Sequence, residues 1–187
     1  GPYGPTTEQE SHETLAAARD LGVNLIDTAN VYGMGISETV IGNYLRHNPG
    51  HFRVATKAGI RRDPATGARY FDNSADHLRS ELEASLKRLG VDHVDLFYVH
   101  RREADRPIEE VTGTLQRFIE EGKIGGFGFS EIAPSSLKLA HAVAPMTAVQ
   151  SEYSLWTRQP ELGMVEACSD LGVALVAFCP LGRGILA

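Results

Sequence analysis

Cysteine is scarce in this chain, whose 187 residues include only Cys168 and Cys179. A disulfide-stabilised fold would need more, so we expect a reducing compartment, the cytoplasm. We interpret Cys168 as a small core residue of a helix. Cys179 follows an apolar strand and is placed to line a site. A nucleophilic thiol needs a base and an orienting group beside it, and we do not expect that role for either cysteine.

Long hydrophobic runs and an excess of positive charge are also missing. The longest apolar stretch, residues 173–181, is far too short to span a bilayer, and no positively charged segment followed by an apolar run opens the chain. We therefore expect neither a membrane span nor a signal peptide. The 24 acidic residues outnumber the 18 basic ones, for a net charge of -6. A negative net charge disfavours non-specific nucleic-acid binding. The sequence does not indicate the oligomeric state.

Several diagnostic motifs are absent. No H-E-x-x-H or C-x-x-C spacing occurs among the seven histidines and two cysteines, so no metal site is predicted. No G-x-G-x-x-G follows an early strand, which disfavours an open dinucleotide-binding sheet. The glycines at 125, 126 and 128 fall within a predicted strand, and close backbone packing is the interpretation we favour for them.

What the chain does have is a regular alternation of short apolar runs with amphipathic stretches. Strands are predicted at residues 23–26, 52–56, 94–99, 124–129, 147–149 and 173–178, and helices at 7–21, 38–46, 75–89, 107–121, 134–143 and 161–171. The polar segment 61–73 is predicted to be a long loop and is the best candidate for a mobile one. The repeated strand–helix order indicates a parallel sheet, either a closed barrel or an open doubly wound sheet.

Polar residues at the ends of the predicted strands favour the barrel. Five of them follow the carboxyl ends of five different strands: Asp27, Lys57, His100, Ser130 and Gln150. A barrel gathers such residues at one mouth, where its active sites lie. We therefore predict an α/β fold, a single (β/α)8 TIM-barrel domain over residues 1–187. Six strand–helix units do not close eight, so a first strand and a final strand–helix region are expected to be missing from this chain.

Four residues suggest carbonyl chemistry: Asp27, Tyr32, Lys57 and His100. A carbonyl that accepts hydride becomes an alkoxide and needs a proton. Tyrosine can donate one, although its ordinary pKa is about 10, and a nearby ammonium such as that of Lys57 stabilises the phenolate. A buried lysine in turn needs a carboxylate, which Asp27 can supply. A histidine at the same mouth can orient the substrate oxygen.

Each of these residues also has a plainer interpretation. Asp27 could cap a turn, Tyr32 could pack a loop, Lys57 could lie on the surface, and His100 could be a satisfied histidine at a strand end. Singly, each plain interpretation is the better one. It is the occurrence of all four at strand ends or in one adjoining loop that favours the functional interpretation.

The motifs around these residues resemble those of the aldo-keto reductase family, in family order along essentially the whole chain. Residues 27–33 (Asp-Thr-Ala-Asn-Val-Tyr-Gly) resemble the segment with the family's aspartate and tyrosine, residues 55–57 its lysine strand, and residues 95–100 its histidine strand. Further similarity lies at residues 121–124, 128–131, 149–154 and 180–184. The pair His100–Arg101 and residues 150–156 look most like the branch that contains pyridoxal reductases and perakine reductase.

The resemblance implies NADPH as the cofactor and a small carbonyl compound as the substrate. It also implies a set of cofactor-binding residues: Ser130, Glu131, Gln150, Phe178, Cys179, Leu181, Gly182 and Arg183. Ser130 and Gln150 would bind the nicotinamide carboxamide, and Phe178 would stack on the ring. Glu131 stands where many members have asparagine, and a carboxylate cannot donate the hydrogen bonds of an amide. The family's main pocket for the adenosine 2′-phosphate would follow Ala187, so the preference for NADPH over NADH is an inference from the resemblance.

The function we predict is reduction of aldehydes or ketones by hydride transfer, with Tyr32 as the proton donor. Potassium-channel β-subunits also resemble this family, so a cofactor-binding regulatory subunit is the alternative. Turnover of simple aldehydes would distinguish the two. An unrelated barrel enzyme, such as a phosphate-sugar isomerase, is disfavoured because it would not need a tyrosine–lysine pair.

Overall fold

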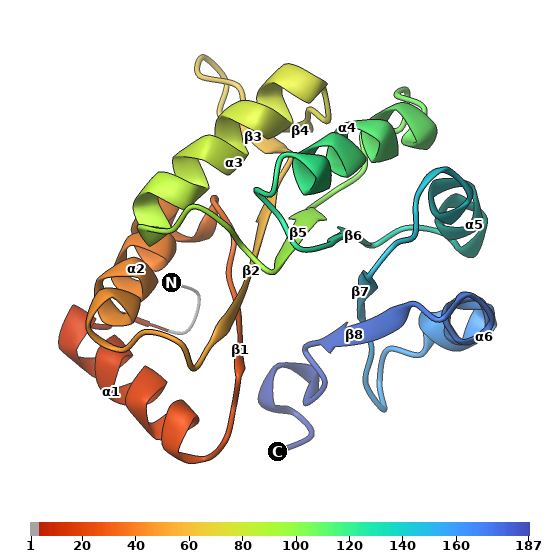
Figure 1. Cartoon of the computed structure of the whole chain (residues 1–187). Helices are drawn as coiled ribbons and strands as arrows, with labels where there is room; N and C mark the ends of the chain where they lie inside the picture. Colours follow the sequence, from red (N-terminus) through yellow and green to blue (C-terminus); the bar gives the residue numbers. More distant parts are fainter. Residues whose placement is uncertain (1–3) are drawn as a thin grey trace.

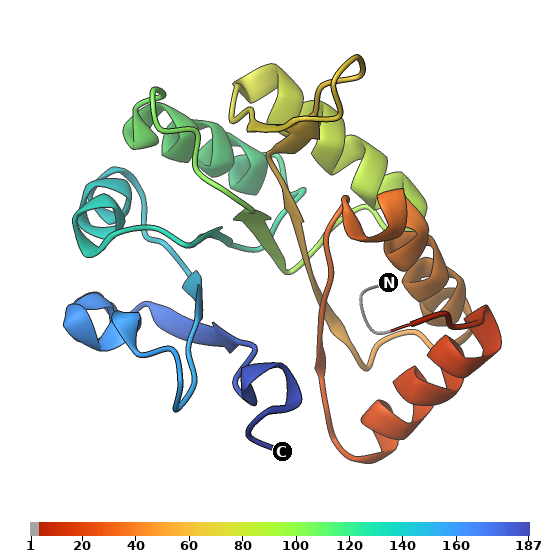
Figure 2. The same ribbon diagram turned by 180° about the vertical axis from the view of Figure 1, so that it is seen from behind.

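Six parallel strands form the frame of the structure, a computed structural model that describes residues 4–187. Neighbouring strands pair in parallel in the order β1 (Leu25–Asp27), β2 (Arg53–Ala58), β5 (Leu96–Val99), β6 (Phe127–Ser130), β7 (Ala148–Glu152) and β8 (Ala174–Phe178). The sheet is curled, so that β1 and β8, its two edge strands, come round towards each other (Figures 1 and 2). All six strands therefore direct their carboxyl ends to one end of the curl.

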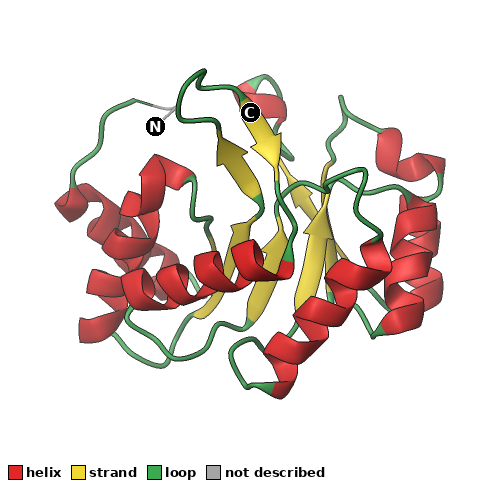
Figure 3. Ribbon diagram, turned by 90° about the horizontal axis from the view of Figure 1, so that it is seen from above, coloured by secondary structure: helices red, strands yellow, loops and turns green. Residues whose placement is uncertain are grey.

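Six α-helices lie on the outer side of this sheet (Figures 1 and 3). They are α1 (Glu8–Asp20), α2 (Ile36–His47), α3 (Ala75–Leu89), α4 (Ile108–Glu120), α5 (Pro134–Val143) and α6 (Met164–Leu171). Thr7 and Ser74 cap the amino ends of α1 and α3 through their side-chain oxygens, and Gly90, in the left-handed conformation, ends α3. Within residues 4–187, none of the helices is both long enough and apolar enough to cross a membrane.

Two apolar layers hold the sheet. The larger lies between the strands and the outer helices and includes four leucines on one face of α3 (Leu78, Leu82, Leu86 and Leu89). The smaller lies inside the curl and is formed by Ala55, Leu96, Tyr98 and Ala148. Because alternate residues of a strand point to opposite faces, β2, β5 and β7 contribute to both layers. This arrangement explains why the strands are apolar almost throughout.

The predicted strands and helices are present, with three differences. Strands β2 and β7 continue to Ala58 and Glu152, so Lys57 and Gln150 lie within their strands rather than after them. The predicted helix at 161–171 is broken by Gly163, which has a φ of 125° and separates the 3-10 turn η2 (Gln159–Leu162) from α6. The prediction of one long loop at 61–73 was wrong.

That segment forms a hairpin of β3 (Ile60–Arg62) and β4 (Arg69–Phe71), which pair in antiparallel fashion. The turn between them is stabilised by the Asp63 carboxylate, which accepts hydrogen bonds from the backbone N–H groups of Ala65 and Thr66, both at 2.8 Å. Such a side-chain-stabilised turn lets short polar strands pair. Because the segment is polar, the sequence predicted a loop rather than two paired strands.

The prediction of close packing at the glycines of residues 125–128 is confirmed. A Cβ atom at Gly126 would lie 2.2 Å from the hydroxyl oxygen of Thr147. One at Gly128 would lie 2.3 Å from the carbonyl oxygen of Ala148 and 2.7 Å from the Tyr98 ring. Glycine is therefore required where β6 approaches its neighbours.

We predict that Gly128→Ala lowers the free energy of unfolding by about 3 kcal/mol, because the added methyl group meets backbone that cannot move away. Gly113→Ala is the matched control: a Cβ atom there meets nothing within 4 Å, and the site lies inside α4. We expect that change to raise the free energy of unfolding by about 0.5–1 kcal/mol. Urea denaturation of both variants measures the difference, and equal effects would contradict the packing argument.

Candidate active site

The carboxyl ends of the strands surround a cavity of about 320 Å³. Its walls are formed by Asp27, Tyr32, His100, Arg101, Ser130, Gln150, Val176, Ala177, Phe178 and Cys179. Asp27 and Ser130 are the last residues of β1 and β6, and His100 directly follows β5. The structure thus brings together residues that are up to 152 positions apart between Asp27 and Cys179.

Lys57 lies beneath this cavity and is fully buried. Its ammonium group donates hydrogen bonds to the carboxylate of Asp27 and, at 2.8 Å, to the carbonyl oxygen of Thr28. Burial lowers the pKa of Lys57, and the Asp27 carboxylate opposes that shift. A buried ammonium is stable only with such a partner, so the two residues form one unit.

Gln150 holds the other carboxylate oxygen of Asp27, to which its Nε2 donates at 2.8 Å. Gln150 is on β7 and Asp27 on β1, and three strands separate them in the sheet. The bond spans the inside of the curl. The bond therefore depends on the curvature of the sheet, and it holds the carboxylate oxygen of Asp27 that does not bind Lys57.

Tyr32 lies over Lys57 from the loop after β1. The Lys57 ammonium is 5.3 Å from the centroid of the Tyr32 ring, and the Tyr32 and His100 rings meet edge to face with centroids 5.8 Å apart. The loop continues through Gly33, Met34 and Gly35, all with positive φ, before α2 begins. This tight turn leaves the Tyr32 side chain on the wall of the cavity.

His100 is buried, and its surroundings keep it neutral. Desolvation, together with the positive charges of Lys57, Arg101 and Arg69, lowers the pKa of His100 to about 3. Within the part of the chain that the structure describes, neither ring nitrogen has a hydrogen-bond partner, and Nδ1 is buried. A neutral imidazole carries one N–H donor, so His100 can offer a hydrogen bond to a ligand oxygen without adding charge.

Four of the predicted cofactor-binding residues, namely Ser130, Gln150, Phe178 and Cys179, line the same cavity. Three more lie in the turn after β8, which contains the 3-10 turn η3 (Gly182–Gly184): Leu181, Gly182 and Arg183. These three do not line the cavity. Arg183 reaches back to the carboxylate of Glu152 at 3.4 Å.

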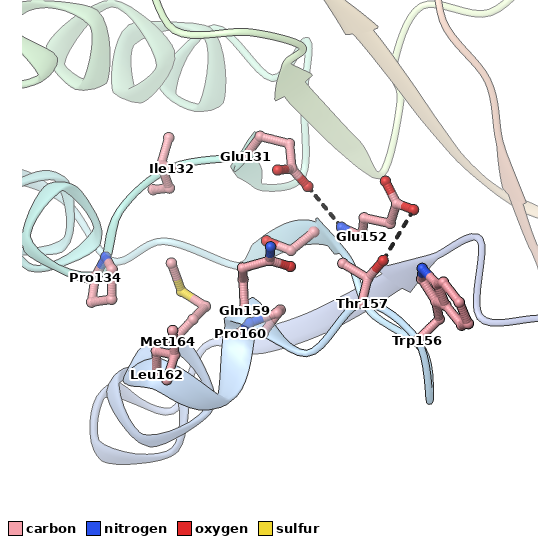
Figure 4. A pocket seen from close by; sticks show the side chains of 11 residues that line it. Glu131, Ile132, Pro134, Glu152, Trp156, Thr157, Gln159, Pro160, Leu162 and Met164 are labelled. Atoms are coloured by element: carbon pink, nitrogen blue, oxygen red, sulfur yellow. Dashed lines mark hydrogen bonds between the residues drawn. The ribbon is translucent and has the colours of Figure 1, made fainter. Parts of the chain in front are cut away.

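Glu131 faces a second cavity, of about 670 Å³, between the loops that follow β6 and β7. Its φ is 58°, and its carboxylate accepts a hydrogen bond from the backbone N–H of Glu152 at 2.7 Å (Figure 4). Trp156 and Met164 are among the other residues of this cavity. The Glu131 side chain thus lines a different cavity from the one that Asp27 and His100 line.

Sequence reasoning missed three residues of the first cavity: Arg101, Val176 and Ala177. The signal for Arg101 was its position directly after the candidate histidine. Val176 and Ala177 precede Phe178 on β8 and carry no polar group that would single them out. For residues 4–187, no cluster of three histidine, cysteine, aspartate or glutamate side chains could hold a metal ion.

We predict that His100 makes the stability of the protein sensitive to acid. Its pKa falls from an ordinary 6.5 to about 3 on folding, so the folded state binds fewer protons than the unfolded state. Stability is therefore fully present above about pH 6.5 and is lost as the pH falls towards 3, by up to about 1.4 kcal/mol per pH unit. Urea denaturation across this range should show a shallower loss for His100→Gln than for the wild type. Parallel curves would contradict the burial of a neutral histidine.

Known proteins resemble this chain along nearly its whole length. The model of the "Aldo/keto reductase family" matches residues 1–187. The chain is 39% identical over 189 residues to "Aldo-keto reductase yakc [NADP(+)]" of Schizosaccharomyces pombe, covering 98% of this chain and 56% of the relative. It is 40% identical over 186 residues to "Probable aldo-keto reductase 1" of Glycine max, covering 98% and 54%. The chain thus spans about half the length of these curated relatives.

Two solved structures share the fold. The glycerol dehydrogenase AKR11B4 from Gluconobacter oxydans superimposes with a TM-score of 0.90 at 33% identity, covering 98% of this chain and 57% of that one. The aldo-keto reductase AKR11C1 from Bacillus halodurans, in its holo form, gives 0.89 at 28% identity, covering 98% and 61%. This likeness confirms the predicted barrel fold class. With a family model that matches throughout and a tyrosine, lysine, aspartate and histidine around one mouth, the chain belongs to the aldo/keto reductase family.

Proposed function

We propose that the protein reduces aldehydes or ketones to alcohols with NADPH as the reductant. The observation that carries this proposal is the buried ion pair of Lys57 and Asp27 beneath Tyr32, with neutral His100 beside it. A solvent-exposed or unpaired lysine would leave Tyr32 an ordinary phenol. The relative from Schizosaccharomyces pombe is named with NADP(+), which supports the choice of cofactor.

The free hydrogen-bonding groups of the cavity fit a nicotinamide carboxamide. Ser130 Oγ accepts a hydrogen bond from Arg101 at 2.9 Å, so its own hydroxyl hydrogen is available to donate. Gln150 donates to Asp27 through Nε2, and its Oε1 accepts no bond from residues 4–187. One donor and one acceptor complement the carbonyl and the amino group of a carboxamide. Phe178, on the wall, offers an apolar face for the ring.

We assign the phosphate side of the cofactor to the turn after β8. Cys179, Gly182 and Arg183 have φ values of 50°, 58° and 58°, a compact left-handed backbone that can bring N–H groups close to an anion. Leu181 lies within this turn. Glu131 faces the second cavity, so we propose for it an indirect role: holding the backbone of Glu152, two residues after Gln150.

Five side chains and the cofactor take part in the proposed reaction. NADPH, when bound, would supply the hydride to the carbonyl carbon. His100 donates a hydrogen bond that orients the carbonyl oxygen, and Tyr32 gives that oxygen its proton. The Lys57 ammonium stabilises the phenolate that remains. Asp27 keeps Lys57 charged inside the protein, and Gln150 fixes Asp27.

Two finer predictions stay open to experiment. Membership of the branch with pyridoxal reductases and perakine reductase depends on the pair His100–Arg101 and on residues 150–156, and turnover of pyridoxal tests it. The prediction of a cytoplasmic location is based on the low cysteine content, and Cys168 and Cys179 are both free thiols. The substrate we expect is a small molecule.

We predict that Tyr32→Phe lowers kcat for benzaldehyde by about 100- to 10,000-fold, because the proton donor is lost. NADPH binding, followed by quenching of protein fluorescence, should be unchanged. Tyr44→Phe is the matched control, since the Tyr44 hydroxyl lies in the core without a partner among the described residues. Equal activity of Tyr32→Phe and wild type would disprove the mechanism. A wild-type protein that binds NADPH and reduces no aldehyde would favour the regulatory subunit instead.

A further inference from the structure

Arg101 is the one residue of the first cavity whose charge the proposed mechanism does not use. It directly follows His100, and its side chain is half-buried on the cavity wall. Nη1 donates to the carbonyl oxygen of His100 at 2.6 Å and to Ser130 Oγ at 2.9 Å. Within residues 4–187, Nε and Nη2 have no partner and no carboxylate pairs with the guanidinium. One edge of the group is anchored, and the other edge is free.

The charges around the cavity do not balance. Among residues 4–187, Asp27 is the only carboxylate on its wall, and it is already paired with Lys57. His100 is neutral, with a pKa lowered to about 3 in part by Arg101 and by Arg69 on β4. A guanidinium stays charged throughout the ordinary pH range. The cavity therefore carries a surplus positive charge in a protein whose net charge is -6.

The position of Arg101 separates it from the phosphate side that we assigned to the cofactor. It follows β5, whereas Gly182 and Arg183 follow β8, and β6 and β7 lie between these strands in the sheet. Its immediate neighbour is His100, which faces the carbonyl oxygen in the proposed mechanism. Arg101 thus lies on the side of the cavity where His100 would meet the substrate.

We propose that Arg101 binds an anionic group of the substrate, so that the protein prefers carbonyl compounds that carry a carboxylate near the carbonyl group. This inference rests on the proposed carbonyl reduction and names its substrate class. A planar guanidinium with two free donors on one edge matches the two oxygens of a carboxylate. The hydrogen bonds from Nη1 to His100 and Ser130 hold the group in place before the substrate binds, which reduces the entropy lost on binding.

The test compares an acid with its neutral ester in the full-length protein at saturating NADPH. The substrates are 3-formylbenzoate and methyl 3-formylbenzoate, which share the aldehyde and differ in charge. We expect Arg101→Gln to lower kcat/KM for the acid at least about 10-fold more than for the ester, mainly through KM. Arg101→Lys, which keeps the charge and loses the planar fork, should recover part of the preference.

Arg62→Gln is the matched control, because it removes the same charge from the β3–β4 hairpin, outside the cavity wall. It should leave the acid-to-ester ratio of kcat/KM at the wild-type value. An equal loss for acid and ester in Arg101→Gln would mean that Arg101 only positions His100 and Ser130, and it would overturn the proposal. No change in either substrate would overturn it too.

A binding experiment separates this inference from the reaction. Calorimetric titration of 3-(hydroxymethyl)benzoate into the NADP⁺-saturated protein should show weaker binding, by about 10-fold, in Arg101→Gln. If the wild type reduces neither aldehyde but this difference persists, the proposed function fails and the anion site stands. If the wild type reduces the ester and binds the acid no better than Arg101→Gln does, the anion site fails and the proposed function stands.

Discussion

The buried ion pair of Lys57 and Asp27 is the interaction on which the site depends. An ammonium group with no exposed surface is costly unless a carboxylate and further hydrogen bonds surround it. Here Asp27 and the carbonyl oxygen of Thr28 do so, and Gln150 holds the second oxygen of the carboxylate. The pair places a positive charge directly under the Tyr32 ring. Its neighbour His100 is kept neutral first by burial, which lowers the pKa of the imidazole, and then by the same positive charge.

The curled parallel sheet is what makes this pair possible. Asp27 is the last residue of β1 and Lys57 the last but one of the adjacent strand β2, whereas Gln150 comes from β7 on the far side of the sheet. Only a sheet that bends back on itself can bring Gln150 within 2.8 Å of Asp27. Gly126 and Gly128, just before and within β6, permit the close approach of Thr147, Ala148 and Tyr98 from the neighbouring strands. The curvature of the sheet thus brings together the residues of the site.

Much of this arrangement could be predicted because its signals are local. The apolar runs predicted parallel strands, and the helix predicted at residues 75–89 has the bounds of α3. Lys57 was predicted to follow the strand at residues 52–56 and lies one residue before the end of β2. The hairpin at residues 60–71 could not be predicted in this way, because its strands are polar and a side-chain-stabilised turn decides the pairing. The same holds for Glu131, whose backbone conformation turns its carboxylate into the second cavity.

Arg101 shows where local signals end. In the sequence Arg101 is only the residue that follows His100. Its proposed role depends on its neighbours in the fold, which are Ser130 and a cavity with a surplus positive charge. A residue's charge balance depends on groups from several strands, which no single segment of the sequence contains. The family resemblance supplied the candidate reacting groups, and the structure supplied the contacts on which the proposed role of Arg101 depends.

The central claim is that a nicotinamide cofactor bound in this cavity gives a hydride to a carbonyl carbon. The most direct measurement is to incubate the full-length protein with benzaldehyde and NADPH deuterated at both C4 positions, and to analyse the alcohol by proton NMR and mass spectrometry. We expect benzyl alcohol with one deuterium on its carbinol carbon, formed at a rate that depends on Tyr32. Saturable NADPH binding with no deuterated alcohol from this or any other aldehyde tested would contradict the account.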